Sequence, residues 1–229
     1  MRPEYPTIVY TRILKELYPD VPVVLGGIEA SLRRLTHYDY WKEQYKPSIL
    51  VESGADMIIY GMGEMPTLDL CRSLQEAIQT SHPLLHYDEN GEPCITTACF
   101  RDAVQHTRQI PQTVSLYSEH EIPGHISEED IVLHSFEDSV RNGKLHAENF
   151  RHIEEESNRI HAHRLLQKHG KAWAVVNPPY PPLTQEQLDH SFDLPYTRLP
   201  HPKYKGKRIP AYEMIKFSVN LHRGCFGGC

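Results

Sequence analysis

Several features that mark particular protein classes are missing from this sequence. No apolar run approaches the roughly 18 residues that a transmembrane helix needs, so no membrane association is predicted. The first residues, Met-Arg-Pro-Glu-Tyr-Pro, contain no apolar stretch of the kind found in secretory signals. Repeats and low-complexity tracts are absent as well. Neither a GxGxxG nor a Walker motif occurs, which disfavours binding of a nicotinamide or of a nucleoside triphosphate.

Cysteine is scarce and unevenly distributed. The chain has five cysteines, an odd number at irregular spacing, which argues against the disulfide framework of a secreted domain. Cys94 and Cys99 flank an expected short strand and are interpreted as buried thiols. We therefore expect a cytoplasmic protein whose thiols stay reduced and available to a metal.

Positive charge is limited overall but concentrated in one region. The 229 residues carry a net charge of -6, so no general attraction to nucleic acid or anionic lipid is expected. Residues 198–223, however, contain seven Lys or Arg against one acid, Glu213. This strip could meet RNA, a phosphate-bearing substrate or an acidic partner, but a solvated surface segment is the preferred explanation.

The apolar pattern of the first 80 residues alternates between strand and helix. Residues 21–25 and 55–60 are short continuous apolar runs, each closed by glycines, as is typical of buried parallel strands. Helical spacing follows at residues 9–17, and Met65, Leu68, Cys71, Leu74 and Ile78 then recur at the spacing of one helix face. The pattern predicts an α/β fold with a doubly wound, Rossmann-like parallel sheet.

The remaining elements are predicted from shorter signals. Strands are expected at residues 94–100, 113–117, 171–177 and 214–220. Ser135 with Asp138, and Thr184 with Gln187, have the spacing of capping boxes at helix starts. Gly170 is expected to end the helix that contains Phe150. Eight of the 18 prolines fall at residues 178–210, which predicts an extended connector.

The last ten residues contain two closely spaced cysteines within a glycine-rich loop. Cys225 and Cys229 have the first spacing of a CxxxCxxC iron–sulfur loop, and Gly224, Gly227 and Gly228 allow the close approach that a cluster requires. Zinc held with His222 is an alternative, as is an incidental pair of cysteines. A redox dithiol is disfavoured because its usual motif is CxxC.

Several blocks of the sequence resemble the YgiQ-type radical SAM proteins, nearly from end to end. The matching blocks are residues 22–34, 37–41, 59–64, 177–179, 193–198, 201–202 and 222–229. The resemblance implies a [4Fe–4S] cluster that binds S-adenosyl-L-methionine and cleaves it, on one-electron reduction, to methionine and a 5′-deoxyadenosyl radical. It also implies that Cys225 and Cys229 are metal ligands and that Phe226 shields the cluster. By the same resemblance, a flavodoxin or ferredoxin would supply this electron, and the radical would abstract hydrogen from an unknown substrate.

The resemblance also divides the chain into expected domains. Residues 1–177 would be an α/β N-terminal domain whose start is missing, 178–211 a connector, and 212–229 the first strand and cluster loop of a radical SAM barrel. The third cluster cysteine of the family pattern would fall beyond residue 229, so this fragment is expected to be inactive alone.

The glycine turns at residues 26–27 and 61–63 resemble those of cobalamin-binding domains. The Asp-x-His-x-x-Gly motif of a cobalt-ligating histidine is absent, and tight strand–helix turns explain the glycines without a corrinoid. Residues 37–41, His-Tyr-Asp-Tyr-Trp, are interpreted as a packing or interface element, with a substrate pocket as the alternative. A non-catalytic module that binds a corrinoid, RNA or a protein partner remains the alternative function.

Overall fold

The computed structural model describes residues 5–19, 21–79, 85–95 and 107–219. The chain forms two compact units, Met1–Pro181 and Pro182–Cys229. None of the helices in the described part of the chain combines the length and apolarity needed to cross a bilayer.

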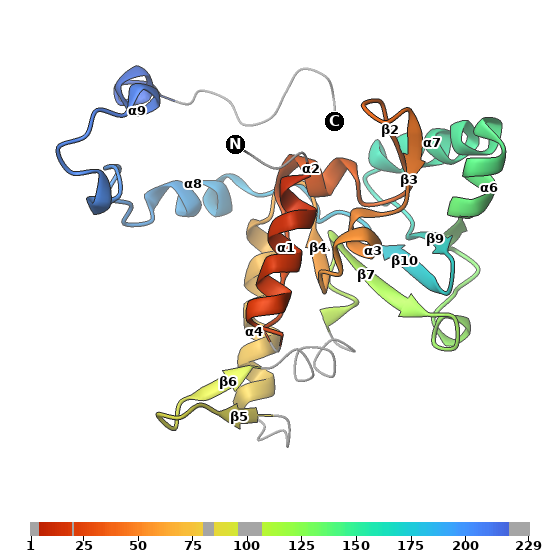
Figure 1. The fold of residues 1–229 in the computed structure, drawn as a ribbon, viewed down its shortest axis with the longest axis horizontal. Helices are drawn as coiled ribbons and strands as arrows, with labels where there is room; N and C mark the ends of the chain where they lie inside the picture. The colour runs from red at the N-terminus through yellow and green to blue at the C-terminus, as the bar shows by residue number, and fades with distance from the viewer. Residues whose placement is uncertain (1–4, 20, 80–84, 96–106, 220–229) are drawn as a thin grey trace. The chain divides into compact units, whose positions relative to one another are not determined.

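A six-stranded mixed sheet is the centre of the first unit (Figure 1). Its order is β1-β4-β7-β10-β9-β8. The strands are β1 (Val24–Leu25), β4 (Met57–Ile59), β7 (Thr113–Ser118), β10 (Ala172–Val176), β9 (Leu165–His169) and β8 (Ile131–Val132). Two-stranded hairpins β2–β3 (His37–Asp39, Gln44–Lys46) and β5–β6 (Leu85–Tyr87, Pro93–Ile95) are separate from it.

The prediction of a parallel, doubly wound sheet is wrong about the strand directions. β1 and β4 are parallel, as are β8 and β9, but β7 runs antiparallel to both β4 and β10. A buried apolar run predicts that a strand is present and not which way it points, because both directions bury the same side chains. The mixed α/β class is confirmed.

Helices pack against both faces of this sheet. They are α1 (Pro6–Leu17), α2 (Gly27–Leu32), α3 (Ile49–Ser53), α4 (Glu64–Gln79), α6 (Phe136–Arg141) and α7 (Gly143–Ser157), with the 3-10 turn η1 at Ile122–Gly124. The second unit contains α8 (Gln185–Asp193), η2 (Pro202–Tyr204) and α9 (Pro210–Ile215).

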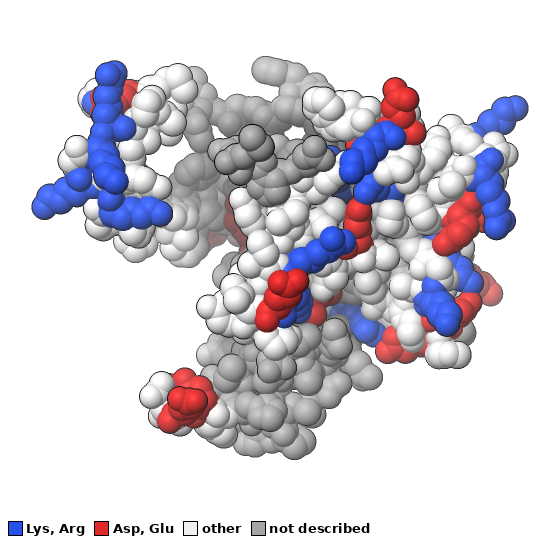
Figure 2. Space-filling model, in the orientation of Figure 1, with Lys and Arg blue, Asp and Glu red and all other residues white. Residues whose placement is uncertain are grey.

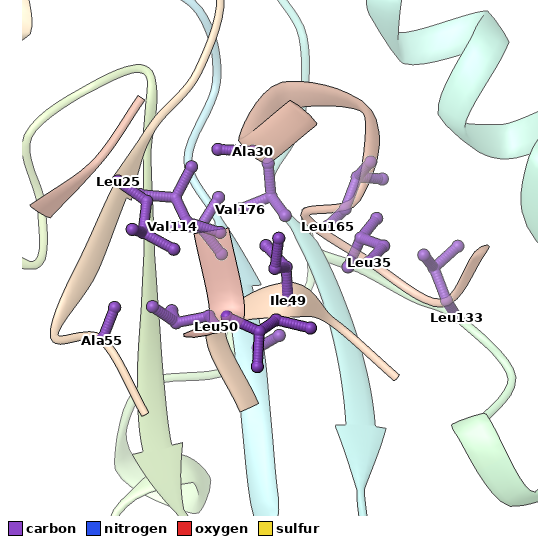
Figure 3. Close-up of a cluster of buried hydrophobic side chains, with 13 residues drawn as sticks. Leu25, Ala30, Leu35, Ile49, Leu50, Ala55, Val114, Leu133, Leu165 and Val176 are labelled. Atoms are coloured by element: carbon purple, nitrogen blue, oxygen red, sulfur yellow. The ribbon is translucent and has the colours of Figure 1, made fainter. Parts of the chain in front are cut away.

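The main core lies on the face of the sheet that α1, α2, α3 and α7 cover. Figure 3 shows the α3 side chains Ile49 and Leu50 directed at the strand residues Val114 and Val176. Leu50 is completely buried, and burying one such side chain contributes about 1.5–3 kcal/mol. On the opposite face, Met57 and Ile59 of β4 pack against Leu70 of α4.

Three details of the predicted helices are corrected by the structure. The α4 residues that turn inward are Pro66 and Leu70, whereas Leu68 is exposed. Helix α7 ends at Ser157, and Phe150 on it is exposed. Gly170 does not end this helix; with φ of +60° it forms the turn between β9 and β10.

The strand predicted at residues 214–220 is also wrong within the described residues. Pro210 starts helix α9, which runs to Ile215, and the Ser218 N–H then donates to the Ile215 carbonyl in a turn. The alternating apolar residues that suggested a strand remain exposed, Phe217 at 90% and Val219 at 80%. A strand requires a neighbouring strand for its backbone hydrogen bonds, and no described strand pairs with this segment.

Candidate functional site at the sheet edge

The predicted metal ligands Cys225 and Cys229, with His222 and Phe226 beside them, lie outside the described residues. Cys99 lies outside them as well, and Cys71 on α4 is an exposed free thiol. Within the described ranges, no group of three or more His, Cys, Asp or Glu is placed to hold a metal ion.

One edge of the sheet brings together three blocks of sequence that lie far apart in the chain. β1, β4 and β10 all end there, and β7 begins there because it runs antiparallel to β4 and β10. The blocks that follow these strand ends are residues 26–34, 60–64 and 177–180. In open sheets, ligands bind beyond the carboxyl ends of strands, so this edge is the candidate site.

A serine hydroxyl connects the two glycine turns at this edge. Ser31 of α2 donates to the carbonyl oxygen of Gly27 (2.8 Å), and its Oγ accepts the N–H of Gly61 (3.0 Å). Gly27 and Gly61 have φ of +82° and +66°, a region that L-residues with a side chain rarely adopt. The glycines are therefore required by the turns, independently of any ligand.

Gln112 fastens the turn after β4 to the start of β7. Its Nε2 donates to the carbonyl oxygens of Tyr60 (2.7 Å) and Met62, and its Oε1 accepts the N–H of Tyr180 (3.3 Å). A Cβ on Gly61 would lie 3.3 Å from the Gln112 Nε2, so a side chain there would crowd the clamp in addition to straining the turn. Nothing in the sequence around Gln112 distinguishes it, and the sequence analysis missed it.

Asn177 ties the end of β10 to the segment that enters β7. Its Nδ2 donates to the carbonyl oxygens of Arg108 (2.7 Å) and Ile110 (3.0 Å) and to Thr113 Oγ1 (3.0 Å). Its own carbonyl oxygen accepts the hydroxyl of Tyr60. Asn177 is 97% buried, since 3% of its surface is exposed, so these bonds form away from water.

Arg34 provides the cation of the edge. Its guanidinium lies over the ring of Tyr60, 4.9 Å from the centroid, and its Nη1 donates to the Ser31 carbonyl. Its Nε is buried and has no hydrogen-bond partner. Burial lowers the pKa of Arg34 and raises that of Tyr60 above its ordinary value. The arrangement holds a charged guanidinium and a neutral phenol, with no proton-transfer pair between them.

Most polar groups at this edge satisfy one another. This makes the edge a rigid junction of strand ends, with Arg34 Nε as its unsatisfied donor. The cobalamin hypothesis for these turns remains an untested prediction.

The His-Tyr-Asp-Tyr-Trp block forms the first strand and tip of the β2–β3 hairpin. Asp39 is buried, and its carboxylate accepts the Tyr5 hydroxyl (2.6 Å) and the Trp41 N–H (3.0 Å). The hydrogen bond from Tyr5 lowers the pKa of this carboxyl. Tyr40 and Trp41 are exposed at the tip, with ring centroids 5.1 Å apart. Asp39 is thus structural, while the tip presents two aromatic rings to solvent.

Comparison with known proteins identifies the class to which this fold and these motifs belong. The model of the family described as "Radical SAM N-terminal" matches residues 1–218. The chain belongs to this radical SAM N-terminal family and, with its relatives, to the UPF0313/YgiQ group. The resemblance to YgiQ-type proteins is confirmed.

The relatives extend well beyond the region that matches. A UPF0313 protein of Bacteroides thetaiotaomicron is 57% identical over 229 residues, which are 100% of this chain and 34% of the relative. The UPF0313 protein YgiQ of Salmonella typhimurium is 39% identical over 257 aligned residues, covering 100% of this chain and 35% of the relative. The chain therefore spans about a third of the length of these relatives. No solved structure matches it.

Proposed function

We propose that this chain contributes to a radical SAM enzyme in which Cys225 and Cys229 are two ligands of a [4Fe–4S] cluster. The observation that carries the proposal is the order of features along the chain. The radical SAM N-terminal match ends at residue 218, and the CxxxC pair follows directly in a glycine-rich loop.

The donor chemistry of this pair fits the cluster. Iron–sulfur clusters are held by cysteine thiolates, and Cys225 and Cys229 supply two of them on a loop with three glycines. The third cysteine of the family pattern would lie beyond residue 229, so the 229-residue chain alone is expected to hold a cluster poorly and not to turn over. Phe226 between the ligands would exclude water from one side.

The bound cluster would supply the electron that cleaves the sulfonium of S-adenosyl-L-methionine, giving methionine and a 5′-deoxyadenosyl radical. A flavodoxin or ferredoxin is the proposed electron donor. The role of the described sheet would be structural. The hydrogen bonds of Gln112 and Asn177 would hold together the strand ends of the N-terminal domain, which precedes the cluster loop in the sequence.

The test begins with the coding DNA beyond codon 229. The expected result is a cysteine at the third following codon and an open frame of barrel length. The longer protein, reconstituted without oxygen, should bind iron and sulfide and form 5′-deoxyadenosine when reduced with S-adenosyl-L-methionine.

Two cysteine variants make this test specific. Cys225→Ala should abolish both cluster assembly and 5′-deoxyadenosine formation. Cys71→Ala is the matched control, because Cys71 is an exposed free thiol on α4 and should leave both unchanged. Undiminished cleavage of S-adenosyl-L-methionine by the Cys225→Ala variant, or a stop codon at position 230, would contradict the proposal.

A further inference from the structure

The second compact unit carries an uncompensated positive surface. Residues 194–210, named here the basic loop, contain five Lys or Arg and no Asp or Glu. The five are Arg198, Lys203, Lys205, Lys207 and Arg208. All five are exposed, and none forms an ion pair with any described residue, whereas Lys216 nearby is paired with Glu213. Figure 2 shows Lys and Arg side chains gathered over the η2–α9 segment, at the upper left of the view.

The charge of the two units has opposite sign. Residues 182–229 hold seven Lys or Arg against four Asp or Glu, a net charge of +3. Because the whole chain carries -6, residues 1–181 carry -9. A local excess of cations in an acidic protein indicates an anionic partner rather than a general need for solubility.

The backbone that presents these cations is held in place. His201 Nδ1 accepts the Lys203 N–H (3.2 Å), and the Tyr204 N–H donates to the His201 carbonyl (2.9 Å). The Lys207 N–H in turn donates to the Tyr204 carbonyl (2.9 Å). Pro200 and Pro202 fix φ around this turn. A loop that is already ordered loses less conformational entropy when it binds a partner.

Exposed aromatic rings lie among the cations. Tyr196 is 56% exposed and Tyr204 is 40% exposed, and the Lys203 Nζ lies 5.0 Å from the centroid of the Tyr204 ring. Cations that track phosphates beside aromatic rings that stack on bases are the combination by which proteins bind single-stranded nucleic acid. A free phosphate or an acidic peptide would use the cations and leave the rings without a role.

We propose that the basic loop binds single-stranded nucleic acid, with its Lys and Arg contacting phosphates and with Tyr196 and Tyr204 stacking on bases. This activity goes beyond the proposed cluster chemistry and does not depend on it, because the basic loop is defined by residues 194–210 and contains no cysteine.

The test measures binding of the 229-residue chain to a fluorescein-labelled oligouridylate by anisotropy over a range of NaCl concentrations. If all five cations contact phosphates, log K should fall with log [NaCl] with a slope of about -3.5, since each contact contributes about -0.7 on single strands. Replacing Lys203, Lys205 and Lys207 together by Gln should make the slope shallower by about 2.

A matched control separates the loop from overall charge. Replacing Lys42, Lys144 and Lys171 by Gln removes the same number of exposed positive charges from the first unit. This control should bind with the affinity and salt slope of the parent. Equal losses in the two triple variants would show that net charge alone attracts the oligonucleotide, and the proposal would fall.

Tyrosine variants distinguish nucleic acid from other anions. Tyr204→Ala should weaken oligouridylate binding about five- to 150-fold, the range expected for one lost stacked base, while the salt slope stays the same. Because Tyr204 is exposed, the variant should keep the far-UV circular dichroism of the parent. Undiminished binding by this variant would overturn the proposal. So would equal competition by polyglutamate or by phosphatidylserine vesicles, which would indicate an acidic protein or a membrane as the partner.

Discussion

Replacing Asn177 by alanine removes a donor that three oxygen atoms share in the interior of the first unit. The acceptors are the carbonyl oxygens of Arg108 and Ile110 and the hydroxyl oxygen of Thr113. Residue 177 also makes two backbone hydrogen bonds: its N–H donates to the Thr113 carbonyl, and its carbonyl accepts the Tyr60 hydroxyl. These two bonds do not depend on the side chain. The substitution therefore isolates the side-chain clamp between β10 and the entry to β7.

The cost follows from the number of bonds and from their burial. A typical hydrogen bond contributes about 1 kcal/mol net, and a buried partner left unsatisfied costs about 1–3 kcal/mol. Two N–H groups shared among three acceptors, at a site 3% exposed, give an expected loss of about 2–3 kcal/mol. This is a large fraction of the roughly 5–15 kcal/mol that stabilises a typical domain.

Urea unfolding followed by circular dichroism measures this loss as a lower midpoint with an unchanged slope. Asn158→Ala is the matched control, because the exposed Asn158 side chain makes one bond, from its Nδ2 to the Glu154 carbonyl (2.8 Å). The control should cost about 0.5 kcal/mol or less. A loss below about 1 kcal/mol in Asn177→Ala would show that the clamp does not hold the junction together.

Two further predictions concern a buried histidine and a glycine turn. Burial lowers the pKa of His169 to about 4, and neither ring nitrogen has a hydrogen-bond partner. In the unfolded chain its pKa would be about 6.5, so below that pH the unfolded state takes up a proton that the folded state refuses, and stability falls. Between pH 7 and pH 5 the free energy of unfolding should fall by about 2 kcal/mol for this reason. His169→Gln should remove this fall in urea titrations at the two pH values. An unchanged pH dependence in the variant would show that His169 is not the group responsible. Gly61→Ala should cost about 2 kcal/mol or more, because φ is +66° and the new Cβ would lie 3.3 Å from Gln112 Nε2. Gly54→Ala, with φ of +75° and nothing within 4 Å, should cost about 1 kcal/mol when both glycine variants are compared by urea unfolding. Equal losses of unfolding free energy in Gly61→Ala and Gly54→Ala would mean that Gln112 moves aside without cost.

The residues at the edge formed by the strand ends need no ligand to explain them. Gly27 and Gly61 are explained by their positive φ angles, and Asn177 by its buried hydrogen bonds. Their presence therefore does not by itself indicate a ligand. The basic loop is different, because its cations form no ion pair within the described part of the chain.

Sequence reasoning succeeded where the determining interactions are local. The Ser135 and Thr184 caps were predicted from residues three positions apart, and in the structure their side chains accept the N–H groups of Asp138 (3.0 Å) and Gln187 (3.2 Å). The strand and glycine turn around Gly61 were predicted in the same way. A cap or a turn is completed by neighbouring residues, so its signal survives in a short stretch of sequence.

The chain by itself thus predicted the sheet strands β1, β4, β7 and β10, the caps at the starts of α6 and α8, the glycine turns and the family to which the protein belongs. Only the tertiary structure decided that β7 runs against β4, that Gly170 turns a hairpin, and that Gln112 clamps the turn containing Gly61. The physical reason is that strand direction and long-range hydrogen bonds depend on which segments meet in space. Gln112 and Tyr60 lie 52 positions apart, and no local pattern records their contact.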